Sequence, residues 1–327
     1  MIEPVLQAYE LPSVDSVERK GSSGGYSGSE VWKICCGNKS FCLKSWPESF
    51  QDEERISWIH RVLLFAKANG CPEISSPILN KYSKTFCWHQ NRFWELSEWA
   101  LGISFENLVD EQPKWNSAIN TTIRFHQATA RFHFNFGESN NLKLVLNRLR
   151  NWKSEVALLT NNFKSTDLIL EQQFSRFIED SPKLSRNLLS QFQSLESLTF
   201  PIQPVVRDLR FEHFYFDADR VTALIDFGAM RIDSVACDLA RLLGSMLDGD
   251  QAKIDFCLNQ YANSRPLNEN EIQLIFCLLY SSSMIGIANW LTWILVDGRN
   301  FESSSEVKSR ISQLFDRFSR TVRPIQI

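Results

Sequence analysis

Short apolar runs separated by turn residues mark the first hundred positions as strand-rich. The runs at 31–34 and 40–44 are joined through a Gly-Asn pair, which predicts a hairpin with a tight turn. Apolar residues recur every three or four positions over 53–68, and a glycine follows, which predicts a helix that ends there. Further short strands are expected at 77–79, 85–88 and 93–97.

Beyond residue 102 the apolar spacing becomes helical. It predicts one long helix over 115–132 and a second over 142–159, with helices continuing to the end of the chain. The segment 204–232 interrupts them with two short strands and loops. We therefore expect an α+β fold with a small antiparallel-sheet lobe, residues 1–98, and a larger mostly helical lobe, residues 99–327.

The stretch 272–296 carries no formal charge and is long enough to cross a bilayer. Its polar residues and acidic flanks favour a buried helix, or two helices broken near the serines at 281–283, over a membrane span. A helical membrane-attached protein remains a third hypothesis, which rests on this stretch alone.

Composition narrows the class of protein. The 327 residues hold 35 Lys and Arg against 38 Asp and Glu, a formal net charge of −3, so no basic field favours nucleic acid as a partner. The N-terminus lacks the pattern of a signal peptide. Eight cysteines without a C-x-x-C pair indicate reduced thiols, and we expect a cytoplasmic protein.

Two carboxylates in the interrupting segment are the candidate chemistry. Asp208 ends one apolar strand, and Asp226 ends another eighteen residues later, followed by Phe-Gly. One carboxylate can accept a proton from a hydroxyl while the other holds a divalent cation against a polyphosphate, which is the division of labour that phosphoryl transfer needs. Upstream, a glycine-rich turn over 21–28 would let backbone N–H groups approach phosphates.

Lys44 lies on the strand after the hairpin, where it could pair with the same phosphates. Taken alone, a strand lysine is more often a solvated side chain, a glycine loop merely turns, and a D-F-G triplet occurs by chance. The order of glycine loop, lysine, helix, strand, helices, Asp and Asp-Phe-Gly is the stronger signal.

Four segments in that order resemble the aminoglycoside phosphotransferase and choline kinase-like family of the protein-kinase-like superfamily. They are W94-E-L-S-E-W-A-L-G102, R124-F-H-Q-A-T-A-R-F-H133, the run from Val205 to Gly228, and D238-L-A-R-L-L243. The resemblance spans roughly residues 15–320. It implies a bilobal protein-kinase-like fold and an ATP-dependent kinase that uses Mg²⁺ and transfers the γ-phosphate to a hydroxyl of a small-molecule substrate.

The resemblance also implies roles for individual residues. Asp208 would be the catalytic base or would orient the substrate hydroxyl, and Asp226 would ligate the metal. Lys44 would grip the α- and β-phosphates, and Asp238 would brace the catalytic loop. The phosphates would be covered by Gly24, Gly25, Ser27 and Gly28, and adenine would meet the backbone of Ser97, Glu98 and Trp99.

Three departures from the family pattern leave alternatives open. The family has a His two residues before the catalytic Asp and an Asn five after it, whereas this chain has Val206 and His213. His213 could bind Mn²⁺, hydrogen-bond a phosphate or mark lost activity, so a nucleotide-binding pseudokinase with a sensor or scaffold role is the runner-up. For the helix partner of the lysine we name Glu54, although His60 is nearer the expected distance from the helix end.

The two arginines beside the catalytic Asp also have more than one reading. Arg207 and Arg210 could clamp a transferred phosphate or an anionic substrate, or lower the pKa of Asp208. They could equally be surface arginines near a negative site. No motif identifies the substrate.

Overall fold

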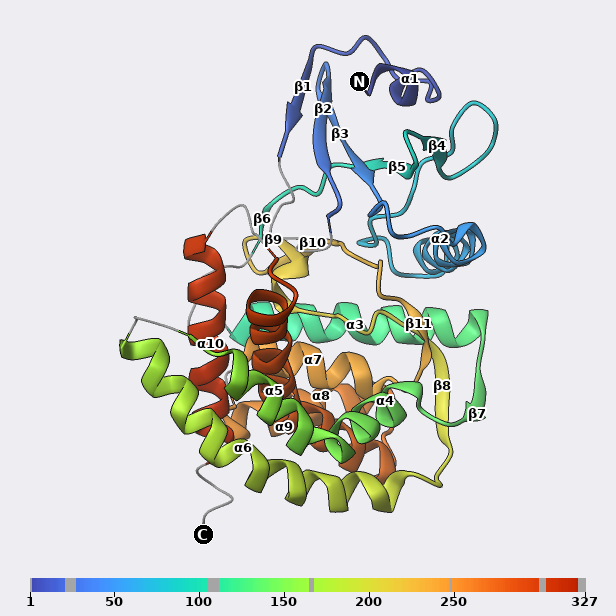
Figure 1. The fold of residues 1–327 in the computed structure, drawn as a ribbon. Coiled ribbons are helices and arrows are strands. Elements are labelled where there is room, and N and C mark those ends of the chain that lie inside the picture. Colours follow the sequence, from blue (N-terminus) through green and yellow to red (C-terminus); the bar gives the residue numbers. More distant parts are fainter. Residues whose placement is uncertain are drawn as a thin grey trace. The chain divides into compact units, whose positions relative to one another are not determined.

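The structure, a computed structural model, describes residues 2–20, 28–104, 112–164, 168–247, 249–299 and 304–322 (Figure 1). The chain divides into two compact units. Unit 1 comprises Met1–His133 and Phe211–Met230, and unit 2 comprises Phe134–Arg210 and Arg231–Ile327. Unit 1 therefore takes in residues 99–133 and 211–230 in addition to the sheet-rich segment 1–98.

Unit 1 contains a five-stranded antiparallel sheet in the order β1-β2-β3-β5-β4. Its strands are β1 (Ser16–Arg19), β2 (Val31–Cys36), β3 (Lys39–Ser45), β4 (Cys87–His89) and β5 (Arg92–Glu98). The predicted hairpin is confirmed, because β2 and β3 pair across a two-residue turn. Gly37 occupies that turn with φ +60°, a left-handed conformation that glycine adopts without steric cost.

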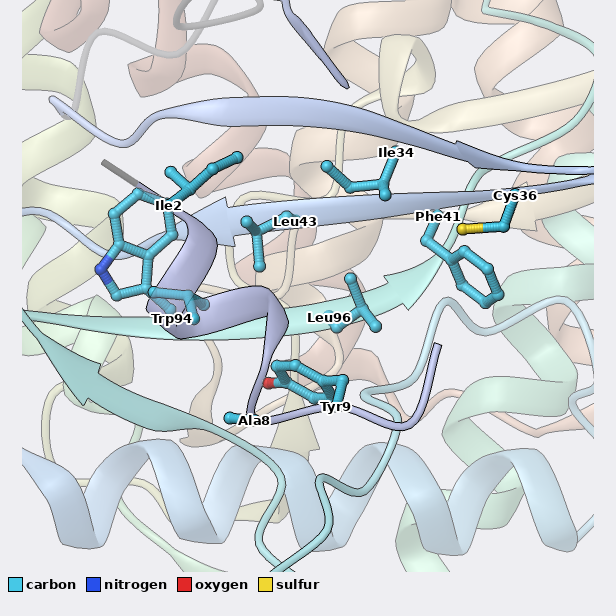
Figure 2. Close-up of a cluster of buried hydrophobic side chains, with 10 residues drawn as sticks. Ile2, Ala8, Tyr9, Ile34, Cys36, Phe41, Leu43, Trp94 and Leu96 are labelled. Carbon is cyan, nitrogen blue, oxygen red and sulfur yellow. The ribbon is translucent and has the colours of Figure 1, made fainter. Parts of the chain in front are cut away.

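The core of this sheet lies on one face, against the short helix α1 (Glu3–Leu6) and the segment after it (Figure 2). Its buried members are Ile2, Val5, Ala8, Tyr9, Ile34, Cys36, Phe41, Leu43, Trp94 and Leu96. Since side chains alternate along a strand, residues next to these core members point to the opposite face. Lys44 follows Leu43, and Glu95 lies between Trp94 and Leu96, so both belong to that opposite face.

Helix α2 (Glu53–Ala68) has the bounds that the periodicity predicts, and Asp52 caps its first turn by accepting a hydrogen bond from the Arg55 N–H. It packs on α3 (Gln112–Phe132), the predicted long helix. The strand expected at 77–79 is wrong. Pro77 forms only an isolated bridge with Ser97, since proline has no N–H to extend a ladder.

A three-stranded sheet in the order β10-β9-β6 completes unit 1. It contains β6 (Ile103–Ser104), β9 (Phe214–Asp217) and β10 (Arg220–Leu224), and the short 3₁₀ turn η1 (Phe211–His213) precedes β9. Gly102 enters β6 with φ +99°, and a Cβ there would lie 2.3 Å from the carbonyl oxygen of Phe216. Only glycine allows this close approach of two backbones.

Unit 2 is mostly helical and also holds a sheet in the order β11-β8-β7. The strands are β7 (Asn135–Gly137), β8 (Phe200–Val205) and β11 (Arg231–Asp233). The helices are α4 (Asn140–Arg150), α5 (Trp152–Asn162), α6 (Leu168–Leu195), α7 (Ala236–Met246), α8 (Gln251–Ser264), α9 (Glu269–Leu291) and α10 (Ser304–Val322), with a π-helical turn η2 (Thr292–Val296) after α9.

The single helix expected over 142–159 is wrong. The chain turns at Asn151, which ends α4 and begins α5 with φ −98° and ψ 8°. The apolar spacing continues through the turn, so periodicity alone could not show the break.

Helix α9 and its π-helical extension occupy the uncharged stretch. A capping box between Asn268 and Glu271 fixes its start, and the helix then runs through the serines without a break. It packs against α6, α7 and α10 in unit 2. Within the described residues, 269–296 is the one helical segment whose length and hydropathy could span a membrane, and 67% of its most apolar window is buried inside the structure. These contacts match the expected buried helix.

Candidate active site

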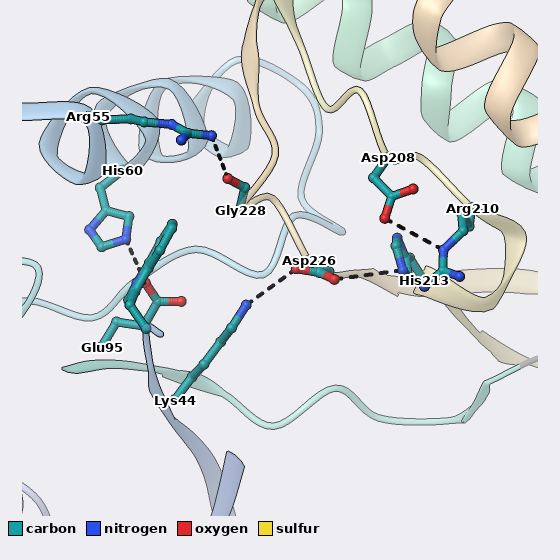
Figure 3. Close-up of polar contacts among 10 residues, drawn as sticks. Lys44, Arg55, His60, Glu95, Asp208, Arg210, His213, Asp226 and Gly228 are labelled. Atoms are coloured by element: carbon teal, nitrogen blue, oxygen red, sulfur yellow. Dashed lines mark hydrogen bonds and ion pairs between the residues drawn. The ribbon is translucent and has the colours of Figure 1, made fainter. Parts of the chain in front are cut away.

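Unit 1 brings together two of the predicted residues that lie far apart in the sequence. Lys44 Nζ on β3 donates to Asp226 Oδ1 over 3.3 Å, across a separation of 182 residues (Figure 3). The Lys44 side chain is 22% exposed and that of Asp226 is 45% exposed. An ammonium and an accessible carboxylate at this distance can together bind a phosphate and the cation that accompanies it.

The backbone around Asp226 is held from two sides. The Leu224 N–H donates to the Glu73 carbonyl oxygen (2.8 Å), and the Ile225 N–H donates to that of His213 (3.1 Å). Asp226 itself has φ +64°, in the left-handed region that a non-glycine residue adopts at a steric cost of about 1–2 kcal/mol. The surrounding hydrogen bonds therefore maintain a strained turn that points the carboxylate outward.

The two residues after Asp226 anchor the same turn. Phe227 is buried and its ring lies 5.9 Å from that of Phe125 on α3. The carbonyl oxygen of Gly228 accepts a hydrogen bond from the Arg55 guanidinium on α2 (2.9 Å) (Figure 3). The Asp-Phe-Gly triplet is thus connected to α2 and to α3.

His213 lies beside the candidate metal ligand. Its Nε2 is 3.8 Å from Asp226 Oδ2, and its side chain is 6% exposed. The register argument that pointed to His213 thus selects a residue that does face Asp226. An imidazole at this position is a poorer ligand for Mg²⁺ than the amide oxygen of the family pattern, and a better one for Mn²⁺.

The donor set limits how a metal could bind. No group of three or more His, Cys, Asp or Glu side chains that could hold a metal occurs among the described residues. Mg²⁺ commonly takes only one or two protein carboxylates and completes its shell with nucleotide phosphates and water. The single accessible carboxylate of Asp226 fits a metal that arrives with a nucleotide, with His213 as a second donor for a softer ion.

The charges around Lys44 keep its ammonium protonated. Burial alone would lower the pKa of Lys44, but the carboxylates of Asp226 and Glu95 outweigh burial and raise it. Glu95 lies directly opposite Lys44 in the pairing of β3 with β5. Sequence reasoning missed Glu95, although it lies one residue inside the segment that resembles the hinge strand.

The helix residue named as partner of the lysine lies elsewhere. Glu54 is exposed in the first turn of α2. The α2 residue that contacts Glu95, the partner of Lys44 in the sheet, is His60. Its Nε2 is 2.8 Å from Glu95 Oε2 (Figure 3). The carboxylates that act on Lys44 are therefore those of Asp226 and Glu95.

The predicted nucleotide contacts are described only in part. Gly24, Gly25 and Ser27 lie outside the described residues, and Gly28 has φ +82° with open space where a Cβ would lie. Ser97 and Glu98 pair with Cys42 and Phe41 at the end of β5. The Trp99 N–H donates to the Ser40 carbonyl oxygen (3.0 Å), so this N–H is already used within the sheet.

In unit 2, the loop after β8 is fixed by one buried carboxylate. Asp238, in the first turn of α7, is completely buried and accepts hydrogen bonds from the N–H groups of Val206 (2.8 Å) and Arg207 (2.6 Å). These bonds agree with the bracing role that the resemblance implied. Arg207 has φ +68°, so this loop, like the turn at Asp226, holds a non-glycine residue in a strained conformation.

Asp208 follows in that loop and is paired with arginines. Its Oδ1 accepts a hydrogen bond from Arg241 Nε over 2.7 Å. Its Oδ2 lies 3.7 Å from Arg210 Nε (Figure 3). Arg207 instead donates to the side-chain oxygen of Asn141 at the start of α4 (2.9 Å). Sequence reasoning missed Arg241, although it lies three residues after Asp238 and thus on a neighbouring position of the same helix face.

A family model described as "Phosphotransferase enzyme family" matches residues 18–263. A comparison with curated protein sequences finds no significant match.

Several solved structures are similar to the whole chain. Spectinomycin phosphotransferase APH(9)-Ia, in complex with ADP and spectinomycin, is 13% identical with a TM-score of 0.67, covering 97% of this chain and 92% of its own. An aminoglycoside phosphotransferase from Alicyclobacillus acidocaldarius is 14% identical with a TM-score of 0.69, covering 100% and 96%. A microcompartment-associated aminopropanol kinase is 12% identical with a TM-score of 0.62, covering 99% and 96%. These likenesses confirm the α+β, bilobal protein-kinase-like fold.

Proposed function

The chain belongs to the phosphotransferase enzyme family, and on that premise we propose that it transfers the γ-phosphoryl group of ATP to a hydroxyl of a small molecule. The observation that carries the proposal is the contact between Lys44 and Asp226, because the two groups that would receive nucleotide phosphates and their cation lie 3.3 Å apart. The ADP named in the spectinomycin phosphotransferase complex supports nucleotide binding.

Each part of unit 1 has a separate task in this proposal. Lys44, kept protonated by its two carboxylate neighbours, contacts the α- and β-phosphates. Asp226, with His213 beside it, would hold a divalent cation, which neutralises charge on the phosphates when it is bound. Gly28 and the glycine-rich segment before it would cover the phosphates with backbone N–H groups.

Asp208 would act on the substrate hydroxyl. The hydroxyl oxygen bonds to the γ-phosphorus as the bond from that phosphorus to the bridging oxygen of ADP breaks, and Asp208 accepts the hydroxyl proton. Arg241 and Arg210 hold the two carboxylate oxygens, and Asp238 fixes the backbone before them. These contacts orient the carboxylate that would accept a hydrogen bond from the hydroxyl.

A nucleotide-binding pseudokinase is the second candidate, and one contact favours it. The 2.7 Å hydrogen bond from Arg241 occupies an oxygen of Asp208 that a substrate hydroxyl would otherwise use. Val206 and His213 replace the family's His and Asn. In this alternative the nucleotide and cation bind through Lys44 and Asp226 without transfer.

Single-turnover transfer distinguishes the two candidates. The chain is incubated with ATP and either Mg²⁺ or Mn²⁺ and with a panel that begins with spectinomycin, other aminoglycosides and aminopropanol, after the names of the similar proteins. Phosphoryl transfer that is lost in Asp208→Ala and kept in the control variant Asp255→Asn supports the kinase. Asp255 is an exposed residue of α8 that accepts a hydrogen bond from Gln251 (2.7 Å).

Nucleotide binding without transfer supports the pseudokinase. A thermal shift by ADP that depends on the cation should be lost in Asp226→Asn and kept in Asp219→Asn, an exposed carboxylate in the same segment. If the wild-type chain neither binds nor transfers across the panel and both cations, both candidates are wrong.

A further inference from the structure

Lys44 has a second carboxylate neighbour that belongs to its own sheet. Glu95 is its direct partner in the antiparallel pairing of β3 with β5, and residues so paired have Cβ atoms about 4.5–5.5 Å apart on one face. The opposite face is committed to the apolar core through Leu43 and Leu96. The alternation of the two strands therefore fixes Lys44 and Glu95 side by side.

Glu95 is held by two further donors. Its Oε2 accepts from Trp46 Nε1 (2.7 Å) and lies 2.8 Å from His60 Nε2, while His60 Nδ1 contacts the Thr85 hydroxyl (2.8 Å). The His60 side chain is 2% exposed, and that of Glu95 is 19% exposed. With both ring nitrogens of His60 engaged, the imidazole is held against Oε2 of the Glu95 carboxylate.

Charge favours the ionised form of this carboxylate. Burial would raise the pKa of Glu95, but His60, Lys44 and Trp46 outweigh burial and lower it. The Lys44 ammonium also lies 5.7 Å from the centre of the Trp46 ring. Lys44 is thus flanked by the half-buried carboxylate of Glu95, held by His60 and Trp46, and by the more accessible carboxylate of Asp226.

We propose that Glu95 is the positioning residue for Lys44, and that His60 is the side chain through which helix α2 is connected to this pair. The inference rests on the proposed function, because the task of Lys44 is phosphate binding. Glu95 shares the ammonium with Asp226 and so keeps the Asp226 carboxylate accessible to a cation. Without the charge of Glu95, Lys44 pairs with Asp226 alone and competes with the metal.

Glu95→Gln tests this competition, since it removes the charge and keeps an oxygen that can accept from Trp46. The dissociation constant of Mn²⁺ is measured by calorimetry on the full chain in the presence of ADP. We expect about tenfold weaker Mn²⁺ binding, the size of effect expected for a partly desolvated charge pair. In a Lys44→Met background the same substitution should change Mn²⁺ affinity by less than about twofold, because the competing ammonium is gone.

The matched control is Glu155→Gln. Glu155 on α5 is also a poorly exposed carboxylate and is paired with a base, Arg148 Nε at 3.0 Å. It should lower thermal stability and leave Mn²⁺ affinity unchanged. If Glu95→Gln does not fold, Glu95→Asp withdraws the charge from Lys44 without removing it. It is measured with and without the Lys44 side chain and should weaken Mn²⁺ binding only where Lys44 is present.

The outcomes separate this inference from the function on which it rests. If the wild-type chain binds ADP and Mn²⁺ and Glu95→Gln leaves both affinities unchanged, the positioning role is wrong and the proposed function stands. If Glu95→Gln weakens Mn²⁺ binding equally with and without the Lys44 side chain, the positioning role is also wrong, because that result indicates only a structural role for Glu95. A wild-type chain that binds no nucleotide overturns both.

Discussion

Arg241 donates a hydrogen bond from Nε to Oδ1 of Asp208 over 2.7 Å. This contact joins the candidate catalytic carboxylate to α7, the helix whose first turn also supplies the brace Asp238. The carboxylate and the backbone before it are thus fixed by one helix.

Replacing Arg241 should therefore affect transfer more than nucleotide binding. Arg241→Gln loses the charge and the fork geometry that orient Asp208, and we expect kcat to fall about tenfold with the ADP dissociation constant unchanged. Arg150→Gln is the control, because Arg150 forms a comparable but exposed pair with Glu196 (2.6 Å). A rise in kcat for Arg241→Gln would show instead that Arg241 restrains Asp208.

The brace itself should be a stability determinant. Asp238→Asn leaves one acceptor oxygen for two backbone N–H donors, and we expect the free energy of unfolding to fall by about 2 kcal/mol. The measurement is urea unfolding. Asp250→Asn is the comparison, because Asp250 caps α8 at the surface and asparagine caps a helix equally well. Equal stability of the two variants would contradict the bracing role.

Gly102 and Gly249 both have a left-handed φ, +99° and +83°, but should respond differently to alanine. Gly102→Ala places a Cβ 2.3 Å from the Phe216 carbonyl oxygen, whereas the space around Gly249 is open. We expect Gly102→Ala to cost about 3 kcal/mol, from the left-handed strain together with the clash, and Gly249→Ala about 1 kcal/mol from strain alone. Unfolding curves of the two variants compare the costs; similar values would mean that β6 and β9 can separate without loss.

The thiols should react in a definite order. Hydrogen bonds from Ser16 and Ser40 lower the pKa of Cys35, whereas burial raises the pKa of Cys71, Cys257 and Cys277 to about 12. A lowered pKa means more thiolate at neutral pH, so a thiol reagent should modify Cys35 first and the other three only after unfolding.

Ser40→Ala tests the cause of this reactivity. It removes the contact from Ser40 Oγ to Cys35 Sγ (3.7 Å) and should shift the reaction of Cys35 to higher pH. An unchanged pH dependence would contradict the assigned cause.

The elements that the sequence predicted well are those with local signals. The hairpin at Gly37 and helix α2 depend on a turn and a periodicity that neighbouring residues determine. The break at Asn151 was missed because the apolar spacing runs through it. Glu54 was chosen by its place in the helix, whereas the contact between His60 and Glu95 depends on how α2 packs on β5, which no local pattern records.

The candidate site likewise divides into residues that local motifs identify and residues that only the fold brings into place. Motif order selected Asp208, Asp226, Lys44 and His213. In the structure, Lys44 and His213 each lie within 4 Å of Asp226. Arg241 and Glu95 lie inside segments that carry the resemblance, but the sequence assigned them no role, since each acts through a neighbour in the fold. Helical spacing from Asp238 and strand pairing from Lys44 could have suggested them only after the fold was known.

The most direct test of the central claim is transfer of a radiolabelled γ-phosphate from ATP to the substrate panel, with wild type and Asp208→Ala compared at equal nucleotide occupancy. We predict labelled product from the wild-type chain, in amounts that depend on the divalent cation, and none from Asp208→Ala. No labelled product from a wild-type chain that is saturated with nucleotide and metal, for any member of the panel, would contradict the account.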